Sequence, residues 1–287
     1  IQPKTYDISR PFRATVVSSD RIKSDSADGE VRQLILDIPA PSFVYVEGQS
    51  IGVRAPPPFD FGNDHHMRLY SIASTRKGEG GHRTEIAICV RRCFYIDEVS
   101  GEKYPGKCSN YLCDAGVGEE IQITGPYGRH FIMPRDSSAN MLMVGTGTGI
   151  APFRAFIKHI YEEEEEWKGK VRLFYGAKSG LDMLYMNDVK DDISHYYDAG
   201  TFKAFEALSS RPAFDDPSAL GNKLEENAAE VWELIQDPKT HVYVAGIREQ
   251  SKALDTALSH IAGSEENWLR MKREIYLDGR WAEHLYD

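Results

Sequence analysis

The sequence predicts two domains of different fold class: an antiparallel β-barrel followed by an α/β domain with a parallel sheet. The length of 287 residues suits about two domains of ordinary size. Up to about Arg129, short β-rich runs alternate with turn residues, whereas from Asn140 onward strand patterns alternate with helix patterns. We expect the boundary in the polar stretch 133–139, which divides the chain into domains 1–137 and 138–287.

The first domain contains six short runs rich in β-branched and apolar residues, separated by Gly, Pro and Asp. Strands at this spacing are typical of an antiparallel barrel or sandwich. The predicted strands cover 12–19, 31–38, 49–55, 68–74, 84–94 and 120–128. One short helix is expected at 109–114.

The second domain repeats a different unit, in which a buried strand pattern is followed by an amphipathic helix pattern. This alternation predicts a parallel sheet with helices on both faces. The predicted strands cover 141–147, 171–177, 202–209 and 241–246, and the predicted helices cover 150–167, 184–197, 224–235 and 250–262.

The composition excludes several classes of protein. Hydrophobic residues make up 41% and charged residues 27%, as in ordinary globular proteins. The formal net charge of −10 argues against nucleic-acid binding. No apolar run approaches the length of a membrane span, and four cysteines without a secretory leader favour a reducing compartment. We therefore expect a soluble protein.

Three alternating glycines, Gly145, Gly147 and Gly149, form the strongest chemical signal. With Thr146 and Thr148 between them, they follow a predicted strand and open a predicted helix. Glycine lets the backbone approach a phosphate, and a helix N-terminus presents free N–H groups to it. The pattern differs from the usual GxGxxG fingerprint. It favours a nucleotide site over a tight turn that binds nothing.

A second signal lies in the run Arg68-Leu69-Tyr70-Ser71. In a strand, Arg68 and Tyr70 share one face and Ser71 lies on the other. A cation, an aromatic ring and a hydroxyl so close together could bind a phosphate, stack on a flat ring and hydrogen-bond a ring nitrogen. Taken alone, this pattern is common in surface strands.

Together with other segments in the same order, these motifs resemble the plant-type ferredoxin–NADP⁺ reductase family. The matching segments are 47–53, 68–74, 89–92, 106–114, 124–126, 145–154 and 210–211, with an aromatic residue near the C-terminus. The resemblance implies an FAD-binding barrel and an NADP(H)-binding α/β domain. It also implies electron transfer between NADP(H) and a one-electron carrier, ferredoxin or flavodoxin.

The resemblance further implies which residues bind FAD. Arg68 would pair with the pyrophosphate, Tyr70 would stack on the isoalloxazine, Ser71 would lie near flavin N5, and Tyr95 would stack on the adenine. The other residues placed at FAD are Cys89, Val90, Arg91, Gly106, Lys107, Cys108, Ser109, Thr148 and Tyr286.

For the nicotinamide dinucleotide, the resemblance implies that Ser210 and Arg211 hold the 2′-phosphate. The residues placed along the rest of the nucleotide are Gly145, Thr146, Gly147, Thr148, Gly149 and Gly246. Three positions depart from the family pattern: Ala245 stands in place of a cysteine, and Leu220 and Asn222 stand in place of a tyrosine and a glutamine.

The resemblance places the catalytic residues at Ser71 and near the C-terminus. Tyr286 would cover the flavin face that nicotinamide must reach. His284 falls at the position of a family carboxylate and Glu283 is its neighbour, so the sequence leaves open which of them takes that role.

No metal site is predicted. Cys89 and Cys93 are separated by three residues, and Cys108 and Cys113 by four. Neither zinc sites nor plant-type iron–sulfur clusters have this arrangement. Cys89 and Cys93 share one face of a predicted strand and are expected to point into a core.

The implied partner is an acidic electron carrier, which an acidic enzyme would bind through a local basic patch. The candidates are Arg76, Lys77, Arg91, Arg92, Lys103, Lys107 and Arg129. The implied location is the bacterial cytoplasm or the plastid stroma. Two alternatives stay open: the reductase component of an aromatic-CoA oxygenase system, and a non-catalytic flavin-binding electron-transfer or sensor subunit.

Overall fold

The computed structural model contains two compact units, each described here by itself. The structure describes residues 10–27, 29–57, 66–97, 100–163, 166–210, 216 and 218–286. The barrel unit comprises Ile1–Ile132 with Arg154–Phe156, and the α/β unit comprises Met133–Phe153 with Ile157–Asp287. The change of unit at residue 133 lies at the start of the polar stretch in which the sequence predicts the boundary; residue 137 itself stays a prediction.

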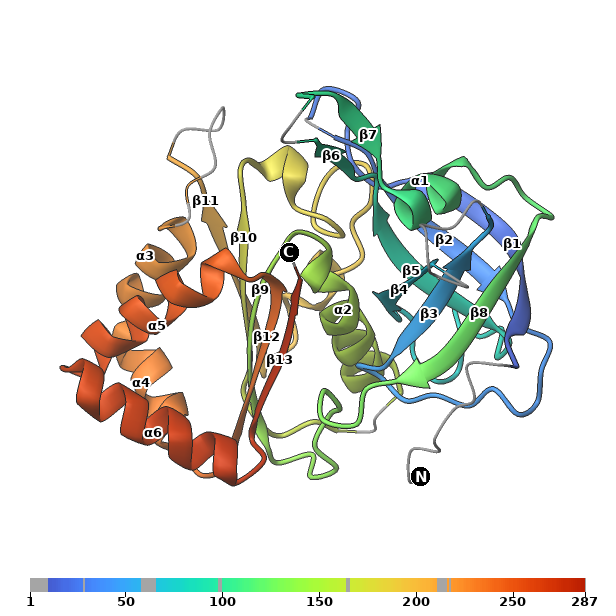
Figure 1. Cartoon of the computed structure of the whole chain (residues 1–287). Coiled ribbons are helices and arrows are strands. Elements are labelled where there is room, and N and C mark those ends of the chain that lie inside the picture. The colour runs from blue at the N-terminus through green and yellow to red at the C-terminus, as the bar shows by residue number, and fades with distance from the viewer. Residues whose placement is uncertain are drawn as a thin grey trace. The chain divides into compact units, whose positions relative to one another are not determined.

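The barrel unit is built on a six-stranded antiparallel sheet with the order β4-β3-β8-β1-β2-β5 (Figure 1). Its strands are β1 (Phe12–Arg21), β2 (Val31–Asp37), β3 (Ser50–Ala55), β4 (His66–Ser71), β5 (Glu85–Arg91) and β8 (Glu120–Tyr127). An antiparallel bridge between Ile72 and Ile88 joins the two end strands, so the sheet closes on itself. Alternating residues such as Val16, Leu34 and Ile88 fill its interior.

Three short elements follow β5: a hairpin of β6 (Phe94–Ile96) and β7 (Lys103–Pro105), and helix α1 (Lys107–Asp114). The strand expected over 84–94 is therefore confirmed as β5 but ends at Arg91, and its predicted continuation to residue 94 is wrong. The chain leaves the sheet at Arg92, whose guanidinium pairs with Glu30 at 2.6 Å and with Asp114 at 2.8 Å. Cys93 is exposed beyond this point, not buried with Cys89.

The α/β unit contains a five-stranded parallel sheet with the order β11-β10-β9-β12-β13. Its strands are β9 (Asn140–Thr146), β10 (Val171–Ala177), β11 (Phe202–Leu208), β12 (Thr240–Ile247) and β13 (Trp281–Tyr286), of which β13 was not predicted. The chain runs outward from β9 to β11 and then returns to the other side of β9. The strand order therefore reverses between β9 and β12, and ligands of such sheets bind at this switch point, beyond the carboxyl ends of the strands.

The helices of this part of the chain are α2 (Ile150–Lys158), α3 (Ala219–Glu226), α4 (Ala228–Gln236), α5 (Glu249–Ile261) and α6 (Glu265–Leu277). Within α2, Arg154–Phe156 belong to the barrel unit. Apolar residues of α3, α4, α5 and α6 pack with residues of the sheet. Figure 1 shows α3, α4, α5 and α6 on one side of the sheet, where Trp268 and Leu258 pack with Val144. Helix α6, also not predicted, begins at Ser264, whose hydroxyl accepts a hydrogen bond from the N–H of Asn267 at 3.2 Å. Among the described residues, no helix is both long and apolar enough to cross a membrane.

The helix predicted over 184–197 is wrong. The segment forms turns, a Met186–Asp191 bridge and one 3₁₀ turn, Ser194–Tyr196. The Asn187 side chain accepts hydrogen bonds from the N–H groups of Val189 and Lys190 and donates one to the carbonyl of Met183. Asn side chains that bind the backbone in this way compete with helical hydrogen bonds, so a helix-like apolar pattern is not enough here.

Candidate functional site

The predicted glycine loop lies at the switch point of the parallel sheet. It continues β9 through the 3₁₀ turn Gly147–Gly149 into α2. A Cβ on Gly149 would lie 2.2 Å from the carbonyl oxygen of Ala245, and one on Gly246 would lie 2.3 Å from Thr146 Oγ1. Gly246 also has a φ of +145°. Only glycine allows the ends of β9 and β12 to approach this closely, and the result is a backbone surface suited to a phosphate or a flat ring.

The Tyr286 side chain lies on this loop. Its hydroxyl accepts hydrogen bonds from Thr148 Oγ1 at 2.9 Å and from the Gly149 N–H at 3.0 Å, and donates to the carbonyl of Thr146 at 3.3 Å. These contacts use both the donor and the acceptor capacity of a phenol. In this conformation the C-terminal tyrosine occupies polar groups that a ligand of the loop would need.

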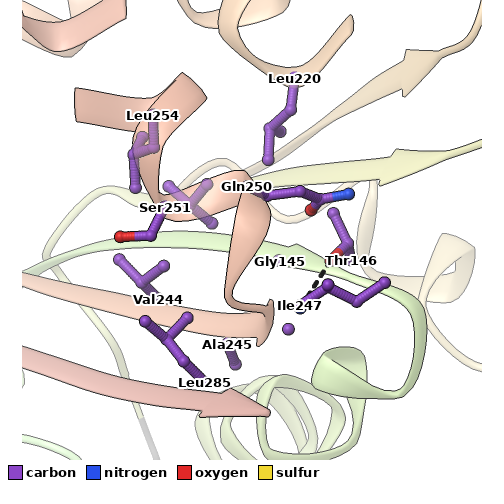
Figure 2. A pocket seen from close by; sticks show the side chains of 12 residues that line it. Gly145, Thr146, Leu220, Val244, Ala245, Ile247, Gln250, Ser251, Leu254 and Leu285 are labelled. Carbon is purple, nitrogen blue, oxygen red and sulfur yellow. Dashed lines mark hydrogen bonds between the residues drawn. The ribbon is translucent and has the colours of Figure 1, made fainter. Parts of the chain in front are cut away.

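A narrow crevice lies between the ends of β9 and β12 and the first turn of α5 (Figure 2). Figure 2 shows Gln250 and Ser251 on α5 and, across the crevice, Ala245 on β12 close to Leu285. Ala245 is buried, and its methyl side chain offers no polar atom to a ligand. Leu220 also lines the crevice and packs into the core, so it does not offer an exposed surface for a nucleotide base in place of the family tyrosine.

A wider groove, of about 420 Å³, lies beside the carboxyl end of β11. Ser210, which the resemblance assigns to a 2′-phosphate, lines this groove, whereas Arg211 lies outside the described residues. The residues that line the groove are Glu206, Ala207, Leu208, Ser210, Asp216, Ala219, Asn222, Lys223 and Glu226. Their three carboxylates were not identified from the sequence, because residues spread over 21 positions come together only in the fold.

Strand β13 separates the two candidates for the catalytic carboxylate position. Since side chains alternate along a strand, His284 shares the face of Tyr286, and Glu283 lies on the opposite face. Glu283 accepts a hydrogen bond from Trp281 Nε1 at 2.6 Å and lies 3.8 Å from Lys272 Nζ on α6. Its contacts are thus with Trp281 of its own strand and with Lys272 of α6, and of the two residues only His284 faces the same way as the loop-bound Tyr286.

The buried environment of His284 keeps its imidazole neutral. Desolvation lowers the pKa of His284 from 6.5 to about 4. We expect stability to fall by about 2 kcal/mol between pH 7 and pH 5, because the unfolded chain binds this proton near pH 6.5 and the folded chain does not. The contribution of neutral His284 to the free energy of unfolding is therefore full above pH 6.5 and decreases as the pH falls from 6.5 to about 4.

Urea unfolding at pH 7 and pH 5 tests this expectation. The His284→Gln variant should lose about 2 kcal/mol less than the wild type over this interval, because glutamine does not titrate. His195→Gln is the matched control, since His195 is an exposed histidine of the same unit. Equal losses in the wild type and in His284→Gln would show that His284 is not held neutral by burial.

In the barrel unit, the residues predicted around a flavin gather at the end strand β4. Arg68 is exposed, and Tyr70 is half-buried against the barrel core. Burial raises the pKa of Tyr70, and the nearby Cys108 adds to this rise. Burial also raises the pKa of the Cys108 thiol, and the positive charge of Arg68 offsets part of it. The structure therefore brings Arg68, Tyr70 and Cys108 together, with Ser71 next in the strand.

The N-terminus of α1 is fixed beside this strand. The Cys108 thiol lies 3.6 Å from the carbonyl of Val53 and 3.8 Å from that of His66. Gly106 is the N-cap of this eight-residue helix and, as a glycine, has no side chain that could accept a hydrogen bond from its first turn. With Lys107 as its first residue, this end suits an anion such as a pyrophosphate. Ser109 instead holds the hairpin, accepting from the Cys93 N–H at 3.1 Å.

The predicted adenine partner Tyr95 lies on the exposed hairpin. Its ring stacks on Tyr104 of the neighbouring strand, with centroids 5.5 Å apart and planes inclined by 23°. Tyr104 was not identified from the sequence, although the cross-strand register places it directly opposite Tyr95. Cys89 and Val90 have buried side chains, so they could meet a ligand only through their backbone, whereas Arg91 is exposed.

Two residues of the predicted basic patch have partners within the barrel unit. Arg76 makes a bidentate ion pair with the buried carboxylate of Glu47, and Arg92 pairs with Glu30 and Asp114. Lys103 lies 4.2 Å from the ring centroid of Phe94. The net positive charge that these side chains offer an acidic partner is therefore smaller than their number implies.

Comparison with known families assigns a class to each part of the chain. The family described as an oxidoreductase FAD-binding domain matches residues 14–132, and the one described as an oxidoreductase NAD-binding domain matches residues 143–255. The first of these parts contains Arg68, Tyr70, Ser71 and Cys108, which form the β4–α1 cluster, and the second contains the glycine loop. The chain is an oxidoreductase with one domain of each kind.

Individual relatives narrow this class. The chain is 36% identical to a ferredoxin–NADP reductase of Synechocystis, over 99% of this chain and 68% of that one. It is 34% identical to the Spirulina enzyme of that name, over 98% and 97%, and 33% identical to a chloroplastic leaf isozyme of Arabidopsis thaliana, over 96% and 77%. The chain belongs to the ferredoxin–NADP reductase family.

A solved structure agrees at the level of the fold. A ferredoxin–NADP⁺ reductase from Plasmodium falciparum superposes with a TM-score of 0.76 at 19% identity, over the full length of both chains. This likeness confirms the predicted combination of an antiparallel barrel with a parallel α/β domain.

Proposed function

We propose that this chain transfers electrons between NADP(H) and a one-electron carrier such as ferredoxin or flavodoxin, using FAD. The observation that carries the proposal is the presence of two ligand cradles in one chain, one in each unit. The barrel unit offers the β4–α1 cluster, and the α/β unit offers the glycine loop at its switch point. The names of the relatives support NADP and ferredoxin, and the matched FAD-binding domain family supports FAD.

The residues of the barrel unit suit FAD. The Arg68 guanidinium and the N-terminus of α1, where glycine is the N-cap, would hold the pyrophosphate, and the Tyr70 ring offers a stacking surface. The Ser71 hydroxyl would hydrogen-bond the flavin, and the Tyr95–Tyr104 pair would hold the adenine. Bound FAD supplies the ability to accept a hydride and release electrons one at a time.

The residues of the α/β unit suit a nicotinamide dinucleotide. The N–H groups at Gly147–Gly149 and the close approach of Gly149 and Gly246 would accommodate its phosphates and nicotinamide. Ser210 and Lys223 would contact the 2′-phosphate, together with Arg211. His284, neutral and on the face of Tyr286, would replace the family carboxylate.

The exposed cations of the barrel unit would receive the carrier. Arg91 and Arg129 are exposed, and an acidic carrier would be steered by such charges. We expect carrier-dependent turnover to fall with added salt. The cyanobacterial and chloroplastic relatives suggest the bacterial cytoplasm or the plastid stroma as the compartment.

Removing the Tyr286 hydroxyl should tighten nucleotide binding. Its hydrogen bonds to Thr148, Gly149 and Thr146 must break before NADP⁺ can use the same loop. We expect Tyr286→Phe to lower the Kd for NADP⁺ roughly tenfold, and Tyr286→Ser to lower it further because the ring is also removed. Calorimetric titration of the FAD-loaded protein with NADP⁺ measures this effect.

The matched control is Tyr276→Phe, which removes a hydroxyl from an exposed tyrosine on α6 of the same unit. Its Kd for NADP⁺ should equal that of the wild type. If Tyr286→Phe also binds NADP⁺ as the wild type does, the hydroxyl does not compete with the nucleotide.

Two assays test the proposed function and its alternatives. We expect NADPH-dependent reduction of ferricyanide, and reduction of cytochrome c that requires added ferredoxin. A protein that binds FAD and turns over neither acceptor would be a binding or sensor subunit. Ferricyanide reduction without any response to ferredoxin or flavodoxin would instead point to a different carrier, as in an oxygenase reductase.

A further inference from the structure

The groove beside β11 has an unusual charge balance for a phosphate site. Among its described lining residues, Lys223 is the one cation, whereas Glu206, Asp216 and Glu226 carry carboxylates. Hydrogen bonds from Ser218 and Ser210 lower the pKa of Asp216, so this carboxylate is ionised. A 2′-phosphate is dianionic or nearly so, and each nearby carboxylate opposes its binding.

The ammonium of Lys223 already pairs with a carboxylate, which competes with a phosphate for it. This ammonium lies 2.6 Å from the Glu226 carboxylate, one helical turn further along α3. The Lys223 side chain is 31% exposed and that of Glu226 is 60% exposed. A phosphate that binds Lys223 must therefore share the ammonium with Glu226 or displace it.

We propose that Glu226 is a specificity-determining residue, whose carboxylate competes with the 2′-phosphate for Lys223 and so narrows the preference for NADP(H) over NAD(H). This inference rests on the proposed function, because it assigns the groove to the 2′-phosphate. NAD(H) has a 2′-hydroxyl there, and a carboxylate does not oppose its binding.

Glu226 is distinguished from the other two carboxylates by its contact. Asp216 is held by its hydrogen bonds to Ser218 and Ser210. Glu206 lies on β11. Among the described groove carboxylates, Glu226 is the one that forms an ion pair with Lys223, so its removal should act on that ammonium directly.

The test compares two neighbouring charges on one helix. Calorimetric Kd values for NADP⁺ and NAD⁺ are measured on the FAD-loaded protein and on Glu226→Gln and Glu225→Gln. Glu225 is the matched control, because it is the adjacent acid on α3 but pairs with His260 at 2.8 Å and does not line the groove. Glu226→Gln should tighten NADP⁺ about threefold and leave NAD⁺ unchanged, whereas Glu225→Gln should change neither.

A double-variant cycle tests whether the effect acts through Lys223. Lys223→Gln should weaken NADP⁺ about tenfold. In that background Glu226→Gln should have no further effect. The inference is overturned if Glu226→Gln leaves the NADP⁺ to NAD⁺ ratio unchanged, if Glu225→Gln shifts it equally, or if the gain persists without Lys223. If the variants show the expected ratios of Kd for NADP⁺ and NAD⁺ but the protein does not oxidise NADPH, the proposed function is contradicted while the role of Glu226 is supported.

Discussion

Replacing Gly149 by alanine should lower kcat/KM for NADPH about a hundredfold while FAD stays bound. The new Cβ would lie 2.2 Å from the Ala245 carbonyl oxygen, 2.5 Å from its carbonyl carbon and 2.8 Å from the Gly246 nitrogen. All three are backbone atoms, so the ends of β9 and β12 must separate to make room. Displacement of a binding loop by about 1 Å is enough to cost a hundredfold in rate.

Ferricyanide reduction at varied NADPH, with the FAD content of each preparation, measures this effect. Gly180→Ala is the matched control, because a Cβ there meets no atom within 4 Å in the same unit. It should retain wild-type kcat/KM. If Gly149→Ala matches this control, or if it loses FAD in proportion to its activity, the loop does not hold the nicotinamide nucleotide.

Replacing Arg154 by glutamine should destabilise the barrel unit by about 3–5 kcal/mol. Arg154 is 1% exposed and belongs to this unit by its contacts. Its guanidinium binds both carboxylate oxygens of Glu79, at 2.7 and 2.9 Å, and the carbonyl of Ala73 at 2.8 Å. Glutamine would leave the Glu79 carboxylate without this cation in a site where it is only 13% exposed.

The exposed pair of Arg13 and Glu120 provides the control for this prediction. These side chains lie 3.3 Å apart and are 80% and 62% exposed. Arg13→Gln should cost less than about 1 kcal/mol, because solvent screens exposed ion pairs. Urea unfolding measures both variants. If Arg154→Gln lowers the free energy of unfolding no more than Arg13→Gln does, the buried ion pair does not stabilise the segment that contains Ala73 and Glu79.

The division into a barrel and an α/β unit could be predicted because each fold class has its own periodicity. Glycine and proline residues separate the strands of the barrel, and the spacing of apolar residues changes after Asn140. The glycine loop was predictable for the same reason, since its function depends on residues adjacent in sequence. Strand β13 was missed although Trp281–Tyr286 alternates, because a six-residue run next to the C-terminus gives little pattern to measure.

Other features depend on contacts between residues that are distant in sequence. The hydroxyl of Tyr286 reaches Thr148 across 138 positions, and no local pattern encodes that contact. The groove beside β11 collects Glu206, Asp216 and Glu226 from a strand, a loop and a helix. The false helix over 184–197 shows the opposite case, in which local hydrogen bonds of Asn187 override an apolar pattern.

Anaerobic reduction of the FAD-loaded protein by NADPH is the decisive test of the proposed electron transfer. We expect the purified chain to bind one equivalent of FAD and NADPH to bleach the flavin absorbance band. We also expect Gly149→Ala to bind FAD equally well but to bleach far more slowly, since the two cradles lie in different units. A chain that binds no FAD, or whose bound FAD is not reduced by NADPH, would contradict the proposed electron transfer.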